Sequence, residues 1–170
     1  MVSILALGKG SGKGKHIFNG YLTEFISDRT QACIVGVDVS PYAIQLATAR
    51  TRNKRDRLVF RVGNINCIRN ALSGTPNVDT IIALEVLYAS NNLQRTIREL
   101  AALLPEKGQM LFIANQHIDQ RDTQGHRLLP NQTDITLAIT GLDLPLKVYD
   151  LTQNELPFSS GAFLSWNNTR

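Results

Sequence analysis

Short, almost uninterrupted apolar runs alternate with amphipathic stretches along most of the chain. The apolar runs have the length of buried strands, and they are Ile4–Leu7, Ala32–Val39, Leu58–Val62, Val78–Leu84 and Met110–Ala114. Apolar residues at helical spacing between them predict helices over His16–Ser27, Pro41–Arg50 and Leu93–Leu104. Continuously apolar strands separated by helices are typical of a parallel sheet that is covered on both faces.

The helix boundaries are marked by local signals. Ser40 is a suitable N-cap and Pro41 then occupies the first helical position. Pro105 ends the helix predicted over Leu93–Leu104. In the helix over 16–27, Tyr21 and Phe25 belong to the apolar face that the spacing defines.

The end of the chain follows a different pattern. A helix is predicted over Thr133–Thr140, and strands over Leu146–Leu151 and Ala162–Trp166. The connection between these two strands is short, which favours an antiparallel hairpin. We therefore predict an α/β fold, a three-layer αβα sandwich with a mostly parallel seven-stranded sheet that ends in an antiparallel β-hairpin.

Length and composition fit one folded domain over residues 1–170. Hydrophobic residues make up 43% of the chain and charged residues 19%, which is ordinary for a globular protein. No apolar run approaches the roughly 20 residues of a membrane span, so we expect a cytoplasmic protein without a membrane partner. The two cysteines, Cys33 and Cys67, do not have the spacing of a metal site, and no metal is expected.

The net charge of +4 leaves two interpretations open. Basic residues concentrate in one cluster, made of Arg50, Arg52, Lys54, Arg55, Arg57 and Arg61. Such a cluster can serve an RNA partner, or it can be a solvated helix end, where cations are favoured by the helix dipole.

Candidate chemistry begins in the glycine-rich segment Leu7–Gly14, which directly follows the first predicted strand. Glycines there let the backbone approach a ligand closely. A phosphate-binding P-loop is excluded because Leu7 stands at its first glycine and Gly14 at its hydroxyl position. The dinucleotide fingerprint fails as well, since Lys13 or Lys15 stands where its third glycine belongs.

The segment Ile4–Gly12, ILALGKGSG, resembles the first motif of class I S-adenosylmethionine-dependent methyltransferases, V-L-D-L-G-x-G-x-G. Val35–Ile44 resembles their second motif, in which an acid ends a strand and Ser-Pro opens a helix. Arg61–Ile65, Asp79–Tyr88 and Leu103–Ile113 resemble three further motifs of the family, the second of these in its small-molecule methyltransferase form. The motifs follow in the family's order along nearly the whole chain.

The resemblance implies the Rossmann-like methyltransferase fold and S-adenosyl-L-methionine as cofactor. A carboxylate at a strand tip, here Asp38, can accept hydrogen bonds from both ribose hydroxyls, and Asn64 stands where the family has an acid that contacts the adenine amino group. The residues expected to bind the cofactor are Gly8, Lys9, Gly10, Gly12, Asp38, Val39, Asn64, Ile65 and Glu85.

Three departures from the family pattern qualify this expectation. Ala6 replaces an acid that helps to hold the methionine ammonium, a loss of about 1.5–3 kcal/mol. Asn64 replaces the adenine-contacting acid, although its side-chain oxygen can still accept from an amino group. The usual cap helices before the first strand are also missing, so we expect an open pocket, a shortened gene product, or a homodimer or partner subunit that covers the pocket.

Methyl transfer needs little chemical machinery beyond positioning, but an acceptor that starts protonated needs a base. Glu85 lies just past the fourth predicted strand and His117 past the fifth, at the edge where such sheets bind ligands. Both are candidate catalytic residues; the alternatives are a helix-start acid and an incidental loop histidine.

Three hypotheses on function therefore remain open. The first is a methyltransferase for a small-molecule substrate. The second is an RNA methyltransferase, motivated by the basic cluster. The third is a non-catalytic, methyltransferase-like partner subunit, motivated by Ala6 and Asn64.

Overall fold

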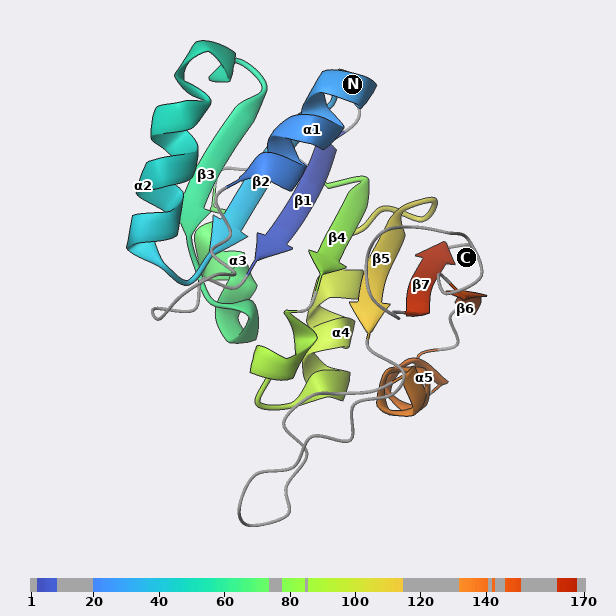
Figure 1. The fold of residues 1–170 in the computed structure, drawn as a ribbon. Coiled ribbons are helices and arrows are strands. Elements are labelled where there is room, and N and C mark those ends of the chain that lie inside the picture. The colour runs from blue at the N-terminus through green and yellow to red at the C-terminus, as the bar shows by residue number, and fades with distance from the viewer. Residues whose placement is uncertain are drawn as a thin grey trace.

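The structure is a computed structural model that describes residues 3–8, 20–73, 78–84, 86–114, 132–140, 142, 146–150 and 162–167. Seven strands form one sheet in the order β3-β2-β1-β4-β5-β7-β6 (Figure 1). Their bounds are β1 Ser3–Gly8, β2 Cys33–Asp38, β3 Leu58–Val62, β4 Thr80–Leu84, β5 Gln109–Ala114, β6 Leu146–Asp150 and β7 Ala162–Asn167. Strand β7 runs antiparallel to both its neighbours, and the other paired strands are parallel.

Helices cover both faces of this sheet. Residues that alternate along a strand therefore belong to two separate apolar clusters, one on each face. The larger cluster joins β4 and β5 to helices on one face, and it contains Ile81, Phe112, Ile97 and Ile135. The smaller cluster lies on the other face and contains Ile34 and Ile82, with Ile26 of the first helix packed against it. The helices are α1 Tyr21–Thr30, α2 Pro41–Arg50, α3 Ile68–Ala71, α4 Leu93–Ala101 and α5 Gln132–Thr140, with short 3₁₀ helices η1 Arg52–Lys54, η2 Ile65–Cys67 and η3 Leu87–Ala89.

These elements confirm the α/β class, and most of their bounds lie within two residues of the predicted ones. Helix α4 ends at Ala101, three residues before the predicted end, and α1 extends to Thr30. Residues 16–19 of the predicted first helix lie outside the described residues. The side chain of Ser40 accepts a hydrogen bond from the backbone N–H of Ala43 at 3.3 Å, and Pro41 opens α2 as expected. In α4, Ile97 and Leu100 are fully buried, as their helical spacing predicts. The short helical stretch of η2 and α3 was not predicted, because it is less than two turns long.

The buried face of α1 differs from the predicted one. Thr23 and Ser27 are completely buried, whereas Tyr21 is 62% exposed and Phe25 51%. The helix starts after Gly20, whose φ is +74° and where a Cβ would lie 2.8 Å from a side chain of α2. Gly20, Thr23 and Ser27 share one helix face, and their small side chains let α1 pack closely against its neighbours.

No helix in the described ranges is both long enough and apolar enough to cross a membrane.

Candidate functional site

The strands β1, β2 and β3 end side by side at one edge of the sheet. Gly8, the last residue of β1, pairs with Asp38, the last residue of β2. Asp38 in turn pairs with Val62 at the end of β3. Because these strands are parallel, their carboxyl ends meet at the edge where ligands of such sheets bind. The start of the glycine-rich segment and the predicted ribose-binding acid are therefore neighbours.

Asp38 is held in place by the backbone around it. Its side chain is completely buried, and its Oδ1 accepts a hydrogen bond from the N–H of Ser40 at 2.7 Å. Its carbonyl oxygen accepts from the N–H of Gly63 at 2.9 Å, which ties the loop after β3 to the end of β2. Helix α2 begins three residues later, at Pro41, and its N-terminus favours negative charge at this position. Val39, the next residue, is 48% exposed.

Gly63 allows the loop after β3 to pass close to α3. A Cβ at this position would lie 2.5 Å from the Cβ of Ala71 and 2.7 Å from Cγ1 of Val37, closer than real Cβ atoms approach. The next two residues lie in different environments. Asn64 is exposed, whereas Ile65 is 6% exposed and belongs to the core, so any contact of Ile65 with a ligand must come from its backbone.

Asn64 and Asn66 form a polar bridge between two loops. Asn64 caps η2, with its Oδ1 accepting from the N–H of Asn66 at 2.9 Å and from Nδ2 of Asn66 at 3.1 Å. Asn66 also donates through Nδ2 to the carbonyl oxygen of Ala89 at 2.9 Å and accepts through Oδ1 from the N–H of Asn91 at 2.8 Å. The bridge fixes the loop after β3 against the loop after β4.

Sequence reasoning missed Asn66. Its partners in the second loop are 23 and 25 residues away, and no local pattern announces such contacts. The only signal in the chain is the recurrence of asparagine in both loops, which alone is an ordinary loop composition. Beside this bridge lies a small pocket of about 150 Å³, lined by Asn66, Asn91, Asn92, Arg95, Thr96 and Glu99.

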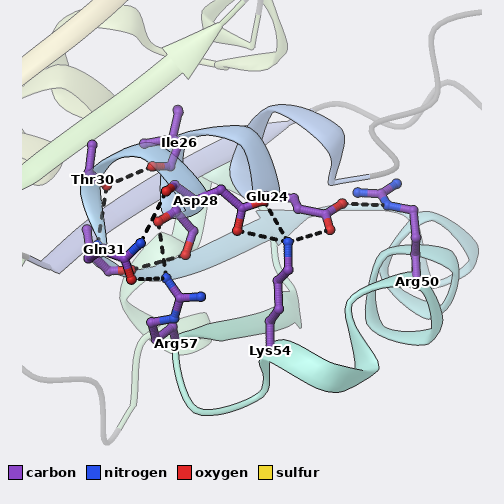
Figure 2. Close-up of polar contacts among 10 residues, drawn as sticks. Glu24, Ile26, Asp28, Thr30, Gln31, Arg50, Lys54 and Arg57 are labelled. Atoms are coloured by element: carbon purple, nitrogen blue, oxygen red, sulfur yellow. Dashed lines mark hydrogen bonds and ion pairs between the residues drawn. The ribbon is translucent and has the colours of Figure 1, made fainter.

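The basic cluster is largely engaged in contacts within the chain (Figure 2). Glu24 of α1 accepts from Nε of Arg50 and from Nζ of Lys54, both at 2.9 Å. Lys54 also pairs with Asp28 at 2.6 Å. These contacts connect α1 to α2 and η1 on one face of the molecule, so Arg50 and Lys54 form a structural clamp between helices with Glu24 and Asp28.

The clamp shifts two pKa values in opposite directions. The hydrogen bond from Lys54 holds the pKa of the Glu24 carboxyl below its usual value, although burial opposes this effect. Hydrogen bonds to Asp28 and then Glu24 raise the pKa of the Lys54 ammonium. Both shifts favour the charged forms, as expected for a paired network.

The other two cluster residues with contacts use different partners. Arg57 donates to the side-chain oxygen of Gln31 at 2.8 Å, and Arg61 donates to the carbonyl oxygens of Ala71 and Ser73 at 2.9 and 2.8 Å. Arg52 and Arg55 are exposed.

The remaining predicted site residues, Lys9, Gly10, Gly12, Glu85 and His117, lie outside the described residues. In the part of the chain that the structure describes, no three His, Cys, Asp or Glu side chains gather as metal ligands.

Comparisons with known proteins agree with this fold. A sequence model of the methyltransferase domain family matches residues 5–150, and no curated protein matches the chain. Among solved structures, the CurJ carbon methyltransferase is 16% identical with a TM-score of 0.73, over 99% of this chain and 49% of that one. This chain therefore spans about half the length of that structure.

Two further solved structures share the fold. Geranyl diphosphate C-methyltransferase from Streptomyces coelicolor A3(2), crystallised with Mg²⁺, geranyl diphosphate and S-adenosyl-L-homocysteine, is 14% identical with a TM-score of 0.72, over 99% of this chain and 71% of that one. A methyltransferase in complex with the Haloferax volcanii Trm112 methyltransferase activator is 15% identical with a TM-score of 0.70, over 99% and 83% of the two chains.

The chain belongs to the methyltransferase domain family, and its fold is that of the class I S-adenosylmethionine-dependent methyltransferases. The resemblance seen in the sequence motifs is confirmed. The expected cofactor, S-adenosyl-L-methionine, is the methyl donor of this family.

Proposed function

We propose that this chain is an S-adenosyl-L-methionine-dependent methyltransferase that acts on a small-molecule acceptor. The observation that supports this most directly is the pairing of Gly8 with Asp38 at the carboxyl edge of the sheet, in a chain that belongs to the methyltransferase family. The pairing brings the first and second motifs together, as one nucleoside-binding site requires.

The residues at the ends of β1 and β2 fit the cofactor's chemistry. Asp38 offers carboxylate oxygens for two ribose hydroxyls, and the N–H of Ser40 holds one of those oxygens in place. The glycine-rich segment, with Gly8, Lys9, Gly10 and Gly12, is assigned to the methionine end. Val39, Asn64 and Ile65 are assigned to the base. When bound, the cofactor supplies an activated methyl group.

The chain's own contribution to the reaction is positioning and proton removal. Well-oriented reactants can lower a barrier by roughly 7–11 kcal/mol, so few specialised groups are required. Glu85, which we also assign to cofactor binding, and His117 are the proposed acceptors of the substrate's proton. A second subunit over this edge, a further copy of the chain or a different protein, is part of the proposal. The Trm112 complex, in which a methyltransferase of this fold is bound to an activator, supports it.

The seven-stranded order with its antiparallel last pair supports a single domain over residues 1–170. The RNA alternative is weakened because four of the six residues in the basic cluster already have partners within the chain. An enzyme that relied on this cluster would bind RNA with steep salt dependence.

The proposal is tested by calorimetric titration with S-adenosyl-L-homocysteine. Asp38→Asn keeps an oxygen for the N–H of Ser40 but removes the charge, and we expect it to weaken binding by at least tenfold, since a hydrogen bond to a charged group is worth about 1.5–3 kcal/mol. Asp56→Asn changes an exposed acid in the same way and serves as the control. Wild-type protein that does not bind millimolar ligand refutes the proposal.

The variant Ala6→Asp distinguishes the non-catalytic alternative from the proposed enzyme, because it restores the acid of the first motif. Methyl transfer to a panel of small acceptors that appears only in this variant identifies the natural chain as a binding module.

A further inference from the structure

The side-chain amide of Asn64 has only one orientation that its surroundings allow. A backbone N–H can be met only by an amide oxygen, so the hydrogen bond from the N–H of Asn66 fixes Oδ1 of Asn64 toward η2. Asn66 is fixed in the same way, because its Oδ1 meets a backbone N–H and its Nδ2 meets a backbone carbonyl. Backbone groups thus determine the direction of both amides.

This arrangement uses up the acceptor capacity of Asn64. An amide oxygen has two lone pairs, and Oδ1 of Asn64 accepts from both the N–H and Nδ2 of Asn66. The Nδ2 group of Asn64, by contrast, donates to no atom of the described residues, and the side chain is exposed. Asn64 therefore presents a hydrogen-bond donor outward.

The topology places this donor on the base side of the proposed nucleoside site. The glycine-rich segment begins at the end of β1, Asp38 ends β2, and Asn64 follows the end of β3. Neighbouring strands are about 4.8 Å apart. A nucleoside whose ribose is bound at Asp38 and whose amino-acid end lies over β1 extends its purine toward the loop after β3, where Asn64 lies.

We infer that Asn64 meets the edge of the purine at position 6 as a donor, so that this site does not select the adenine amino group. The inference rests on the proposed function and replaces the acceptor role that the sequence suggests for Asn64. A donor here opposes a second donor, the 6-amino group of adenine, and complements the 6-oxo group of hypoxanthine. Asn66 is the positioning residue, because its two donors hold Oδ1 of Asn64 away from the ligand.

The test compares two ligands that differ at this position, S-adenosyl-L-homocysteine and S-inosyl-L-homocysteine, by calorimetric titration of the whole chain. The informative variant is Asn64→Asp. Aspartate caps helices as well as asparagine does, so one carboxylate oxygen keeps the contact with η2 while the other faces outward as an acceptor. Asn70→Asp introduces the same charge at an exposed position of α3 and controls for electrostatic attraction. Thermal unfolding of each variant checks that the fold is retained.

Wild-type protein is expected to bind the inosyl ligand at least as tightly as the adenosyl ligand. Asn64→Asp is expected to shift the ratio of the two dissociation constants at least tenfold toward the adenosyl ligand, and Asn70→Asp is expected to leave it unchanged. A wild-type preference of tenfold or more for the adenosyl ligand, or an unchanged ratio in Asn64→Asp, overturns the inference while leaving the proposed function intact. Wild-type protein that binds neither ligand overturns both.

Discussion

Removing the charge of Glu24 tests whether the clamp between α1 and α2 stabilises the fold. In Glu24→Gln the shape of the side chain is retained, but the two charged hydrogen bonds, from Arg50 and Lys54 at 2.9 Å each, are weakened together. The side chains of Glu24 and Arg50 are only 22% and 24% exposed, so solvent screens the contact less than it screens an ordinary surface pair.

The expected loss lies between two reference cases. Hydrogen bonds to charged groups contribute about 1.5–3 kcal/mol, and exposed ion pairs about 0.2–1 kcal/mol. For this partly buried carboxylate we expect the free energy of unfolding to fall by about 1–2 kcal/mol, an intermediate value. In a domain of this size that corresponds to a decrease in Tm of about 3–6 °C.

The effect should depend on pH in a defined direction. The pKa of Glu24 is lowered in the folded protein, chiefly by Lys54. Its contribution is therefore complete above its usual pKa of 4.5 and is lost as the pH falls through the lower folded value. Urea unfolding of wild type and Glu24→Gln should thus differ near neutral pH and converge in acid.

Glu106→Gln, at an exposed turn position, is the matched control and should unfold like wild type. If Glu24→Gln and wild type have the same urea midpoint near neutral pH, the clamp makes no net contribution. A difference that persists at low pH would show that the loss comes from packing rather than from the charge.

Two further substitutions test local features of the site by urea unfolding. Gly63→Ala places a Cβ 2.5 Å from the Cβ of Ala71 and 2.7 Å from Cγ1 of Val37; overpacking of this kind costs about 1–3 kcal/mol, and an unchanged midpoint would mean that the loop relaxes freely. Ser40→Ala removes the cap contact to the N–H of Ala43 and should cost about 1 kcal/mol, whereas Ser40→Asp, which also caps, should retain most of the stability.

Two residues of the candidate site, Asp38 and Asn64, could be placed from the sequence. Asp38 is predicted because Val35–Ile44 resembles the family's second motif, in which an acid ends a strand and Ser-Pro opens a helix, and it lies at the end of β2 beside Gly8. Asn64 follows the end of β3, as the predicted strand Leu58–Val62 implies, but the direction of its side-chain amide could not be predicted. That direction depends on Asn66, whose own side chain is held by the loop after β4.

The partners of the basic cluster and the buried face of α1 could not be predicted from the sequence alone. The cluster resembled a free cationic surface because its counterions, Glu24 and Asp28, lie 26 to 30 residues earlier. Similarly, periodicity pointed to Tyr21 and Phe25 as the buried face of α1, but the side chains of Arg50 and Arg29 stack over these rings at the surface.

The sequence by itself determined the alternation of strands and helices, the cap of α2, the core face of α4 and the order of the motifs. These features depend on residues within a few positions of one another, where backbone periodicity and local hydrogen bonds decide the outcome. Only the tertiary structure decided which face of α1 is buried, which charges are paired and which atom Asn64 presents. Each of those depends on groups that the chain brings together from distant positions when the helices dock on the sheet.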